Sequence, residues 1–293
     1  MNRIKSEPRI VVIGGGTGLS VMLKGLKKYT SHLTAVVTVT DDGGSSGRLR
    51  SELGVLPPGD IRNCLVALAE TETLMDKVFQ HRFNAGDGLQ GHNLGNLLLV
   101  ALTEIAGDFV SAIREVSQVL KVRGQVLPAT LEYVTLAAKM IDGTTVSGET
   151  SIRHHDQKIE KVYLIPEKCM PAPETLEAIR EADAIILGPG SLYTSIIPNL
   201  LVHGVVPAIE ESRAVTCYVS NIMTEKGETD DYSAADHLRV ILEHLGKQII
   251  DYVIVNSGSI DEDRLERYRE ENAVPVKTTS GEIMAMGVRL IEE

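Results

Sequence analysis

The 293-residue sequence contains no tryptophan, only three cysteines and few aromatic residues, 4% in all. The cysteines, Cys64, Cys169 and Cys217, show no Cys-x-x-Cys spacing. Three cysteines cannot all pair with one another, and none of them lies in a metal-ligand pattern. The sequence therefore predicts no disulfide framework, and each cysteine is expected to be a small buried apolar residue.

Long apolar runs and excess positive charge are missing as well. No run of about 18 apolar residues occurs, so no membrane span is predicted. The first ten residues, MNRIKSEPRI, lack the apolar region of a signal peptide. The formal net charge is −11, and general nucleic-acid binding needs a cationic surface. We therefore expect a cytoplasmic protein that neither binds nucleic acid nor spans a membrane.

Motifs of several enzyme classes are absent too. The sequence contains no His-Glu-x-x-His motif and no set of protein-kinase motifs. Its first glycine loop, GGGTGLS at 14–20, departs from the dinucleotide fingerprint, because Leu19 stands where the third glycine is required. No Gly-Lys-Ser/Thr follows, so the loop is not a Walker A loop either. An NAD-dependent oxidoreductase is therefore a weak interpretation, and binding without catalysis is favoured.

Apolar strands alternate with helices at both ends of the sequence. RIVVIGG at 9–15 and LTAVVTVTDD at 33–42 are predicted to be buried strands, and GLSVMLKGLKKY between them has helical apolar spacing. This strand–helix–strand order begins a parallel sheet. Further predicted strands are DAIILGPGS at 183–191, AVTCYVS at 214–220 and IIDYVIVNSGS at 249–259. The helix SAADHLRVILEHLG is expected to carry His237 and His244 on its surface.

The middle of the sequence has a different pattern. Residues 43–59 are predicted to form a long functional loop, and residues 61–120 are mostly helical. Residues 122–165 have a period nearer two, with a typical hairpin turn in IDGTT, and His154 and His155 are placed in a strand. We predict a single α/β domain over residues 1–293, Rossmann-like and doubly wound. Its mostly parallel sheet carries a helical and β-hairpin insertion at roughly 61–165.

Two glycine loops are expected at strand ends, where open α/β sheets bind ligands. Glycines in the first loop allow close backbone approach, and the following helix directs free N–H groups at a phosphate. The second loop repeats this pattern and adds hydroxyl groups. Either loop can also be an ordinary strand-to-helix turn. The candidate phosphate-binding residues are Gly15, Gly16, Thr17 and Gly18 in the first loop and Gly188, Gly190, Ser191 and Thr194 in the second.

Acidic residues follow the second predicted strand, where they would repel a phosphate. Asp41 and Asp42 precede Gly43 and Gly44, and all four are included in the predicted site. In dinucleotide folds an acid at this point accepts hydrogen bonds from ribose hydroxyls, so these carboxylates are predicted to face a sugar or base. Two alternatives stay open. Asp42 and Asp60 would hold a divalent cation that bridges to phosphate, or an aspartate would only cap the loop.

Polar clusters precede two of the predicted helices. In PPGDIRN an arginine and an asparagine follow Asp60, and arginine matches phosphate geometry, although an exposed ion pair is equally typical. QGHNLGN places a histidine in a polar glycine-rich cluster, which favours a site role over a buried structural one. The candidate ligand-binding residues in these clusters are Arg62, Asn63, His92, Asn93 and Asn96.

Six segments together resemble one known family. They are GGGTGLS, TVTDDGGSSGRLR, PPGDIRNCLVALA, GHNLGNLLL, LGPGSLYTS and SNIMTEKGET. In this order they resemble the YvcK-like gluconeogenesis factor family, bacterial proteins linked to cell shape and to growth on gluconeogenic carbon sources. That family is related to 2-phospho-L-lactate transferase, CofD. The resemblance extends from about Arg9 to the last predicted strands.

The resemblance implies a nucleotide-diphosphate ligand, and for the gluconeogenesis factors a UDP-sugar without an established reaction. It places the first glycine loop at the phosphates and Asp41 and Asp42 near the sugar and base. Gly190, Ser191 and Thr194 are then expected to close the other side of the ligand, and Asn221 to line the crevice. The expected function is a regulator that requires no cofactor, with NAD as a surrogate ligand. A protein partner in cell-wall or carbon metabolism and self-association are compatible with this function. The alternative is a transferase that acts on a nucleotide-diphospho-linked substrate.

Overall fold

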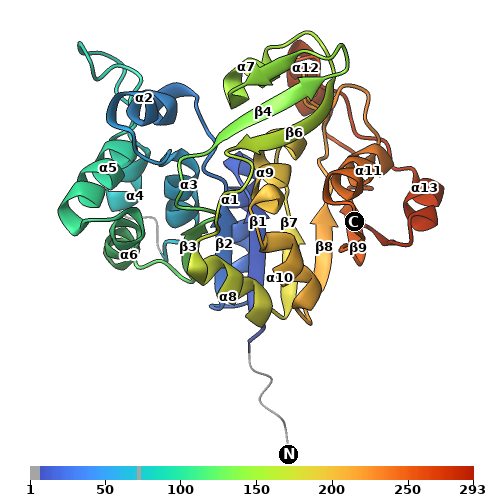
Figure 1. Ribbon diagram of the computed structural model, residues 1–293, viewed down its shortest axis with the longest axis horizontal. Coiled ribbons are helices and arrows are strands. Elements are labelled where there is room, and N and C mark those ends of the chain that lie inside the picture. The colour runs from blue at the N-terminus through green and yellow to red at the C-terminus, as the bar shows by residue number, and fades with distance from the viewer. Residues whose placement is uncertain (1–6, 71–73) are drawn as a thin grey trace, which may run out of the picture.

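The computed structural model describes residues 7–70 and 74–293 and is built around a seven-stranded parallel sheet (Figure 1). The strand order is β10-β9-β8-β7-β1-β2-β3, and all neighbouring strands are parallel. The strands are β1 (Ile10–Gly14), β2 (Leu33–Val37), β3 (Gln125–Pro128), β7 (Ala184–Leu187), β8 (Val215–Val219), β9 (Tyr252–Val255) and β10 (Arg289–Glu292). This sheet confirms the predicted α/β fold class.

The direction of strand addition reverses at β1. The chain continues from β1 to β2 and β3 on one side, whereas β7 to β10 follow on the other side. Val12 of β1 pairs with Ala35 of β2 and with Ile186 of β7. In open α/β sheets, ligands bind beyond the carboxyl ends of the strands at such a reversal. The loops after β1 and β7 therefore mark the expected binding position.

Helices cover both faces of the sheet. Val11 and Ile13 of β1 belong to one apolar core cluster, and Val12 belongs to the other. Because both faces are buried, these strands read as continuous apolar runs in the sequence. The Val12 side holds α1 (Gly16–Leu26), α3 (Gly59–Leu68), α4 (Leu74–Gln80), α5 (Leu94–Ala106) and α6 (Phe109–Val119). The opposite side holds α8 (Pro173–Glu181), η1 (Leu192–Ile196), α9 (Ile197–Leu201), α10 (Val205–Glu211) and α11 (Ala234–Leu245).

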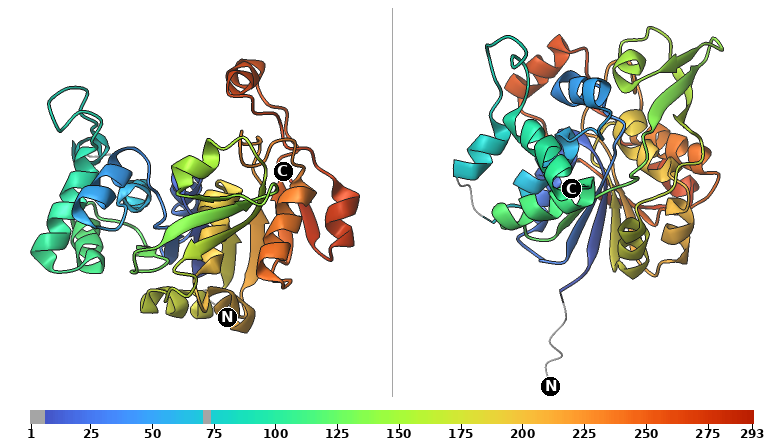
Figure 2. Two further views of the ribbon diagram at one scale, coloured as in Figure 1. Left: turned by 45° about the horizontal axis from the view of Figure 1, so that its top comes forward. Right: turned by 60° about the vertical axis from the view of Figure 1, so that its left-hand side comes forward.

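A three-stranded antiparallel sheet lies at the carboxyl ends of the main strands (Figure 1). It consists of β4 (Thr135–Met140), β5 (Thr145–Ser147) and β6 (Ile159–Ile165), with the short helix α7 (Glu149–Arg153) between β5 and β6. Asp142 accepts a hydrogen bond from the Thr144 N–H at 2.9 Å in the turn, which confirms the predicted hairpin. We call residues 135–165 the arm. Figure 2 shows the arm between the α2–α6 helices and the carboxyl-terminal helices.

The prediction of a long loop at 43–59 is wrong. Helix α2 (Gly44–Leu53) occupies most of this segment and ends at Gly54, whose φ of 67° is left-handed. The glycine and serine content of the segment hides the helix in the sequence. Tertiary contacts stabilise it, because Leu49 is buried and the Arg50 guanidinium donates to the carbonyl groups of Val39 and Val134.

The placement of His154 and His155 in a strand is also wrong. The chain leaves β5 at Gly148, which has a φ of 95°, and then forms α7. Asp42 accepts the backbone N–H of Thr150 at 2.8 Å and so stabilises the first turn of this helix. Both histidines follow the end of α7.

Burial corrects one histidine prediction and supports most of the cysteine prediction. His237 on α11 is fully buried and His244 is half-buried, so neither is a simple surface residue. Cys64 and Cys169 are buried as predicted, Cys217 is half-buried, and all three are free thiols.

Several elements have no counterpart in the sequence-based prediction. The helices α12 (Glu262–Glu270) and α13 (Ser280–Ala285) and the edge strand β10 lie near the end of the chain. Strand β3 lies within the range expected as an insertion but pairs with β2 in the main sheet. In the described ranges, no single helix is long and apolar enough to cross a membrane. Two bent helix pairs, α5 with α6 and η1–α9 with α10, meet those criteria only together.

Candidate functional site

The glycine loops after β1 and β7 lie against each other. A side chain on Gly18 would begin 2.9 Å from the carbonyl oxygen of Pro189, and one on Gly190 would begin 3.1 Å from that of Gly15. Gly188 also has a φ of 82°, which a larger residue rarely adopts. These positions need glycine because the two backbones approach closely. The loops therefore form one surface at the reversal between β1 and β7.

Asp60 faces the first of these loops. Its Oδ2 accepts the backbone N–H of Gly16 at 2.8 Å, at the first turn of α1. A side chain on Gly15 would begin 2.8 Å from the same oxygen. Burial raises the pKa of Asp60, and the nearby Asp41 acts in the same direction. The carboxyl group thus occupies one of the backbone N–H groups at the start of α1, where the sequence predicts a phosphate.

The two aspartates after β2 both bind protein groups. Asp41 accepts the Gly43 N–H at 2.9 Å, which is the loop-capping arrangement left open above. Asp42 accepts the backbone N–H and the hydroxyl of Thr150 at 2.8 and 2.7 Å, so it connects the β2 loop to the arm. Gly44 follows with a φ of 47° and starts α2. Across residues 7–70 and 74–293, no group of three or more His, Cys, Asp or Glu residues is arranged to hold a metal ion.

Arg153 of the arm joins the loops after β7 and β8. Its Nη2 donates to Ser191 Oγ at 2.9 Å and to Thr194 Oγ1 at 3.0 Å. Its Nε pairs with Glu228 Oε1 at 2.9 Å. Ser191 in turn donates to Glu225 Oε2 at 2.5 Å. The hydroxyl groups predicted to bind phosphate are therefore gathered around one guanidinium group.

Three carboxyl groups lie around this guanidinium group. Glu149 is 3.5 Å and Glu228 is 2.9 Å from nitrogens of Arg153, and Glu225 lies beyond Ser191. Burial raises the pKa of Glu228 to about 7, with the charge of Glu225 as the next cause. Burial also raises the pKa of Glu149 well above its usual range. Carboxyl groups perturbed in this way mark functional sites more often than ordinary surface acids.

Arg62 and Asn63 lie away from this cluster. A step of two residues turns a helical side chain by about 200°, so Asp60 faces α1 whereas Arg62 lies along α5. The Arg62 Cδ is 2.8 Å from the point where a side chain on Gly95 would begin. Its Nη2 donates to Asn63 Oδ1 at 2.6 Å. The polar residues of PPGDIRN are therefore divided between two sides of α3.

The segment GGSSG at 43–47 has the Gly-x-Ser-x-Gly spacing of a hydrolase nucleophile turn, and its serine contacts a histidine. Ser45 Oγ lies 3.1 Å from His92 Nδ1 and accepts the Asn93 N–H at 3.1 Å. Both side chains are only 4% exposed, so a substrate has no access to them. Asn93 also caps α5 by accepting the Asn96 N–H at 3.2 Å. In this structure the predicted residues of this cluster connect α2 to α5, and their ligand binding stays a prediction.

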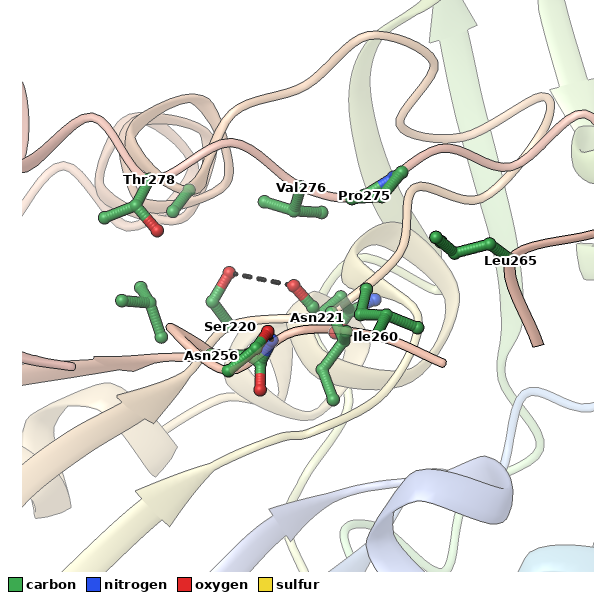
Figure 3. A pocket seen from close by; sticks show the side chains of 12 residues that line it. Ser220, Asn221, Asn256, Ile260, Leu265, Pro275, Val276 and Thr278 are labelled. Carbon is green, nitrogen blue, oxygen red and sulfur yellow. Dashed lines mark hydrogen bonds between the residues drawn. The ribbon is translucent and has the colours of Figure 1, made fainter. Parts of the chain in front are cut away.

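A cavity of about 270 Å³ lies at the carboxyl ends of β8 and β9 (Figure 3). Two asparagines from these strand ends line it. Asn221 Nδ2 donates to Glu225 Oε1 at 3.0 Å, and Asn256 Nδ2 donates to the Gly258 carbonyl at 2.8 Å. Both amide oxygens are thereby left as acceptors, and that of Asn221 is buried without a partner. The apolar part of the lining includes Ile222, Ile260, Leu265, Pro275 and Val276.

A second, wider groove of about 630 Å³ lies between α2 and the arm. Its lining includes Asp42, Gly44 and Gly148, together with Arg48 and Tyr133. Asp42 therefore faces a groove on the opposite side of the β1/β7 reversal from the asparagine-lined cavity.

Residues 10–293 match the family described as 2-phospho-L-lactate transferase CofD. The chain belongs to this family. It is 52% identical over 287 residues to a gluconeogenesis factor of Halalkalibacterium halodurans, covering 98% of this chain and 89% of that protein. The gluconeogenesis factor of Bacillus subtilis is also 52% identical, with coverages of 98% and 90%. A crystal structure of a UPF0052 family member from Bacillus halodurans superposes with a TM-score of 0.95 at 51% identity, covering 99% of this chain and 93% of that one.

The resemblance found in the sequence is thus confirmed, but four charged residues of the candidate site were not predicted. Glu225 and Glu228 lie in SNIMTEKGET, a strand-end segment that carries the family resemblance. Its acidic residues could therefore have been included in the predicted site. Glu149 and Arg153 belong to the arm, in a segment interpreted as strand. Only the tertiary structure brings them to the loops after β7 and β8. Together the site offers backbone N–H groups, hydroxyls, acidic groups and one arginine to a polar ligand.

Proposed function

We propose that the protein is a regulator that binds a nucleotide-diphospho-sugar, in the first instance a UDP-sugar, without turning it over. The observation that supports this most is the order of features along the sheet. The asparagine-lined cavity lies at β8 and β9, the glycine loops follow at β7 and β1, and Asp42 lies after β2. With neighbouring strands about 4.8 Å apart, β8 to β2 spans about 14 Å. A ligand with a base, a diphosphate and a sugar has this same order of chemical groups.

The base belongs in the asparagine-lined cavity. Its volume of about 270 Å³ is near the lower end of ligand pockets, roughly 300–1,000 Å³, so it suits one ring system rather than a whole ligand. Apolar side chains such as Ile222 and Val276 suit the faces of a base. The free amide oxygens of Asn221 and Asn256 suit N–H donors on its edge.

The diphosphate belongs between the two glycine loops. Ser191 and Thr194 already bind the guanidinium group of Arg153 there, and arginine is well matched to phosphate oxygens. The sugar then lies towards Asp42 and the groove beside the arm, where carboxylate oxygens accept hydrogen bonds from hydroxyl groups. NAD, which also carries a diphosphate between two sugar groups, is expected as a surrogate ligand.

The regulatory part of the proposal is supported by the relatives named gluconeogenesis factors. A regulator needs only a ligand that binds two conformations with different affinities. The arm is suited to such a change, because Asp42 and Arg153 are its polar ties to the strand-end loops. We place this activity in the cytoplasm, in control of cell shape and carbon metabolism, with a protein partner that receives the signal.

A transferase is the second candidate. The family is described by a transferase activity, and two carboxyl groups near Arg153, those of the half-buried Glu149 and the buried Glu228, have raised pKa values. A group with a pKa near neutrality can move a proton at physiological pH. This reading requires an acceptor that binds next to the sugar.

Calorimetry with UDP-N-acetylglucosamine, with and without magnesium, tests the proposal, and chromatography follows the nucleotide for several hours. We expect saturable binding and intact ligand. Ser191→Ala should weaken binding about tenfold, since it removes a hydrogen bond to a charged group. Ser117→Ala on α6 is the matched control and should bind as the wild type does. Absence of saturable binding contradicts the proposal, and protein-dependent nucleotide release that is lost in Asp60→Ala favours the transferase.

A further inference from the structure

Arg62 is a buried arginine on the side of α3 that faces away from the nucleotide site. Its side chain is 8% exposed and lies across the first turn of α5, next to Gly95. The Nη2 group donates to Asn63, but Nε and Nη1 are buried without a hydrogen-bond partner. Within residues 7–70 and 74–293, Arg62 forms no ion pair. A buried cation with unpaired donors is costly, so this arrangement calls for an anion.

The surroundings of Arg62 are electropositive. Burial lowers the pKa of Arg62 to about 10, and the charge of Arg82 is the next cause, whereas Asp60 and Asp41 act in the opposite direction. Arg82 donates to the Gly91 carbonyl at 2.7 Å and has no carboxylate partner in the described part of the chain. The amino-terminal end of the 13-residue helix α5 adds a partial positive charge.

Arg48 extends this positive region on the other side of the α5 entrance. It donates to the carbonyl groups of Gln90 and Gly88 at 2.7 and 3.0 Å, and no ion pair is formed with it in the described ranges. The pKa of the neighbouring His92 is lowered by burial, and then by the charge of Arg48, which favours the neutral imidazole. Arg48, Arg62 and Arg82 thus lie around the loop and first turn that begin α5, and in the described ranges none of the three forms an ion pair.

We propose that Arg62 and the first turn of α5 form a second anion subsite, for a phosphate-type oxyanion that is free or carried as a monoester. Such a group accepts hydrogen bonds from a guanidinium group and from a backbone N–H in the first turn of a helix. In α5 the N–H groups of Leu94 and Asn96 already bind the His81 carbonyl and Asn93 Oδ1, so the N–H of Gly95 is the one left for the anion. The subsite is separate from the glycine loops, because α3 lies between them. It does not depend on the nucleotide sugar. Since Nε and Nη1 are shielded, entry requires a local opening between α4 and α5.

Thermal unfolding with inorganic phosphate, at ionic strength held constant with potassium chloride, tests this subsite. The wild type should gain a few degrees in Tm in a saturable manner, because a ligand that binds only the folded state stabilises it. Arg62→Met should lose this gain. In phosphate-free chloride its Tm should equal or exceed that of the wild type, since the substitution removes an uncompensated buried charge. Arg213→Met, at an exposed arginine, is the matched control and should respond as the wild type does.

Two further measurements keep the test decisive. Arg62→Lys keeps the charge but not the planar donors, and should raise the apparent Kd for phosphate at least tenfold. Glycerol 3-phosphate in place of phosphate distinguishes a monoester site from one for the free ion. A wild type without a saturable response, or an Arg62→Met protein that responds normally, overturns the proposal. So does an Arg62→Met protein that is strongly destabilised in chloride, because Arg62 would then be a structural residue with its own partners.

Discussion

Asp60 competes with any phosphate for the N-terminus of α1, because it accepts the Gly16 N–H at 2.8 Å. Asp60→Asn keeps this hydrogen bond and removes the charge. A like charge about 5 Å away opposes an anion by about 3 kcal/mol at an effective dielectric constant of about 20. We therefore expect Asp60→Asn to bind UDP at least tenfold more tightly in magnesium-free buffer, as measured by calorimetry.

The control for this prediction is Asp87→Asn, which neutralises an exposed acid in the loop before α5 and should leave binding unchanged. Measurements with and without magnesium distinguish two roles for Asp60, which are cation binding and repulsion of the phosphate. If the carboxylate holds a cation, Asp60→Asn weakens binding only when magnesium is present. A loss of affinity without magnesium would show that charge repulsion is not what Asp60 contributes.

The titration of a single side chain, Glu228, makes the stability of the folded protein depend on pH. Its pKa is raised by burial to about 7 in the folded protein, above the usual value of 4.5. The folded state therefore binds more protons than the unfolded state between these two pKa values. Proton binding by Glu228 thus adds to the free energy of unfolding below pH 4.5, and this stabilisation is lost as pH rises through 7. Glu149, whose pKa is also raised, acts in the same direction.

We expect the Tm to fall between pH 6 and pH 8.5, and Glu228→Gln to reduce this slope. Glutamine can still accept from Thr194, which lies 2.9 Å away, and carries no charge to bury. Glu104→Gln, at an exposed position of α5, should leave the slope unchanged. A Glu228→Gln protein with the wild-type slope would show that Glu228 is ionised throughout this range.

Two polar residues connect the arm to the strand-end loops. Asp42 binds the first turn of α7, and Arg153 at its end binds Ser191, Thr194 and Glu228. Asp42→Ala removes the hydrogen bonds to Thr150 and leaves those of Arg153 in place. We expect faster amide hydrogen exchange in residues 145–155, while exchange in β1 stays unchanged, because local opening is set by local contacts.

Asp142→Ala provides the matched control for the arm. It removes an aspartate that holds the β4–β5 turn through Thr144, at the far end from the strand-end loops. Faster exchange should then be confined to the turn. Equal exchange at 145–155 in wild type and Asp42→Ala would mean that Asp42 does not hold this part of the arm.

At the level of elements, periodicity was enough to predict the buried strands and the helices with a clear apolar face. Both glycine loops followed from their composition and from their position after strands. Helix α2 could not be predicted in this way, because its stability depends on the contacts of Arg50 with carbonyl groups of Val39 and Val134. Arg153 could not be assigned to the site either, since 38 and 41 residues separate it from Ser191 and Thr194.

The whole molecule explains why acids and phosphate-binding loops occur together. Asp60 reaches the α1 terminus from α3, and Asp42 holds the arm. Glu225 binds Ser191, and Glu228 binds Arg153. Each acid therefore binds a backbone N–H, a hydroxyl or a guanidinium group in this structure. A diphosphate that enters must take over some of these partners, so binding is coupled to the contacts that hold the arm and the two halves of the sheet.

This coupling leads to a prediction for the whole molecule. Saturating UDP-N-acetylglucosamine, at about 100 times its Kd, stabilises the folded state by about 2.7 kcal/mol, and we expect slower hydrogen exchange in three separate segments. These are the loop 14–18 after β1, residues 188–195 after β7 and residues 147–153 of the arm. Strand β3, at the edge of the sheet and away from the strand-end loops, serves as the internal control. Protection confined to one side of the β1/β7 reversal would mean that the ligand does not bridge the two halves, and the order of base, diphosphate and sugar along the sheet would have to be abandoned.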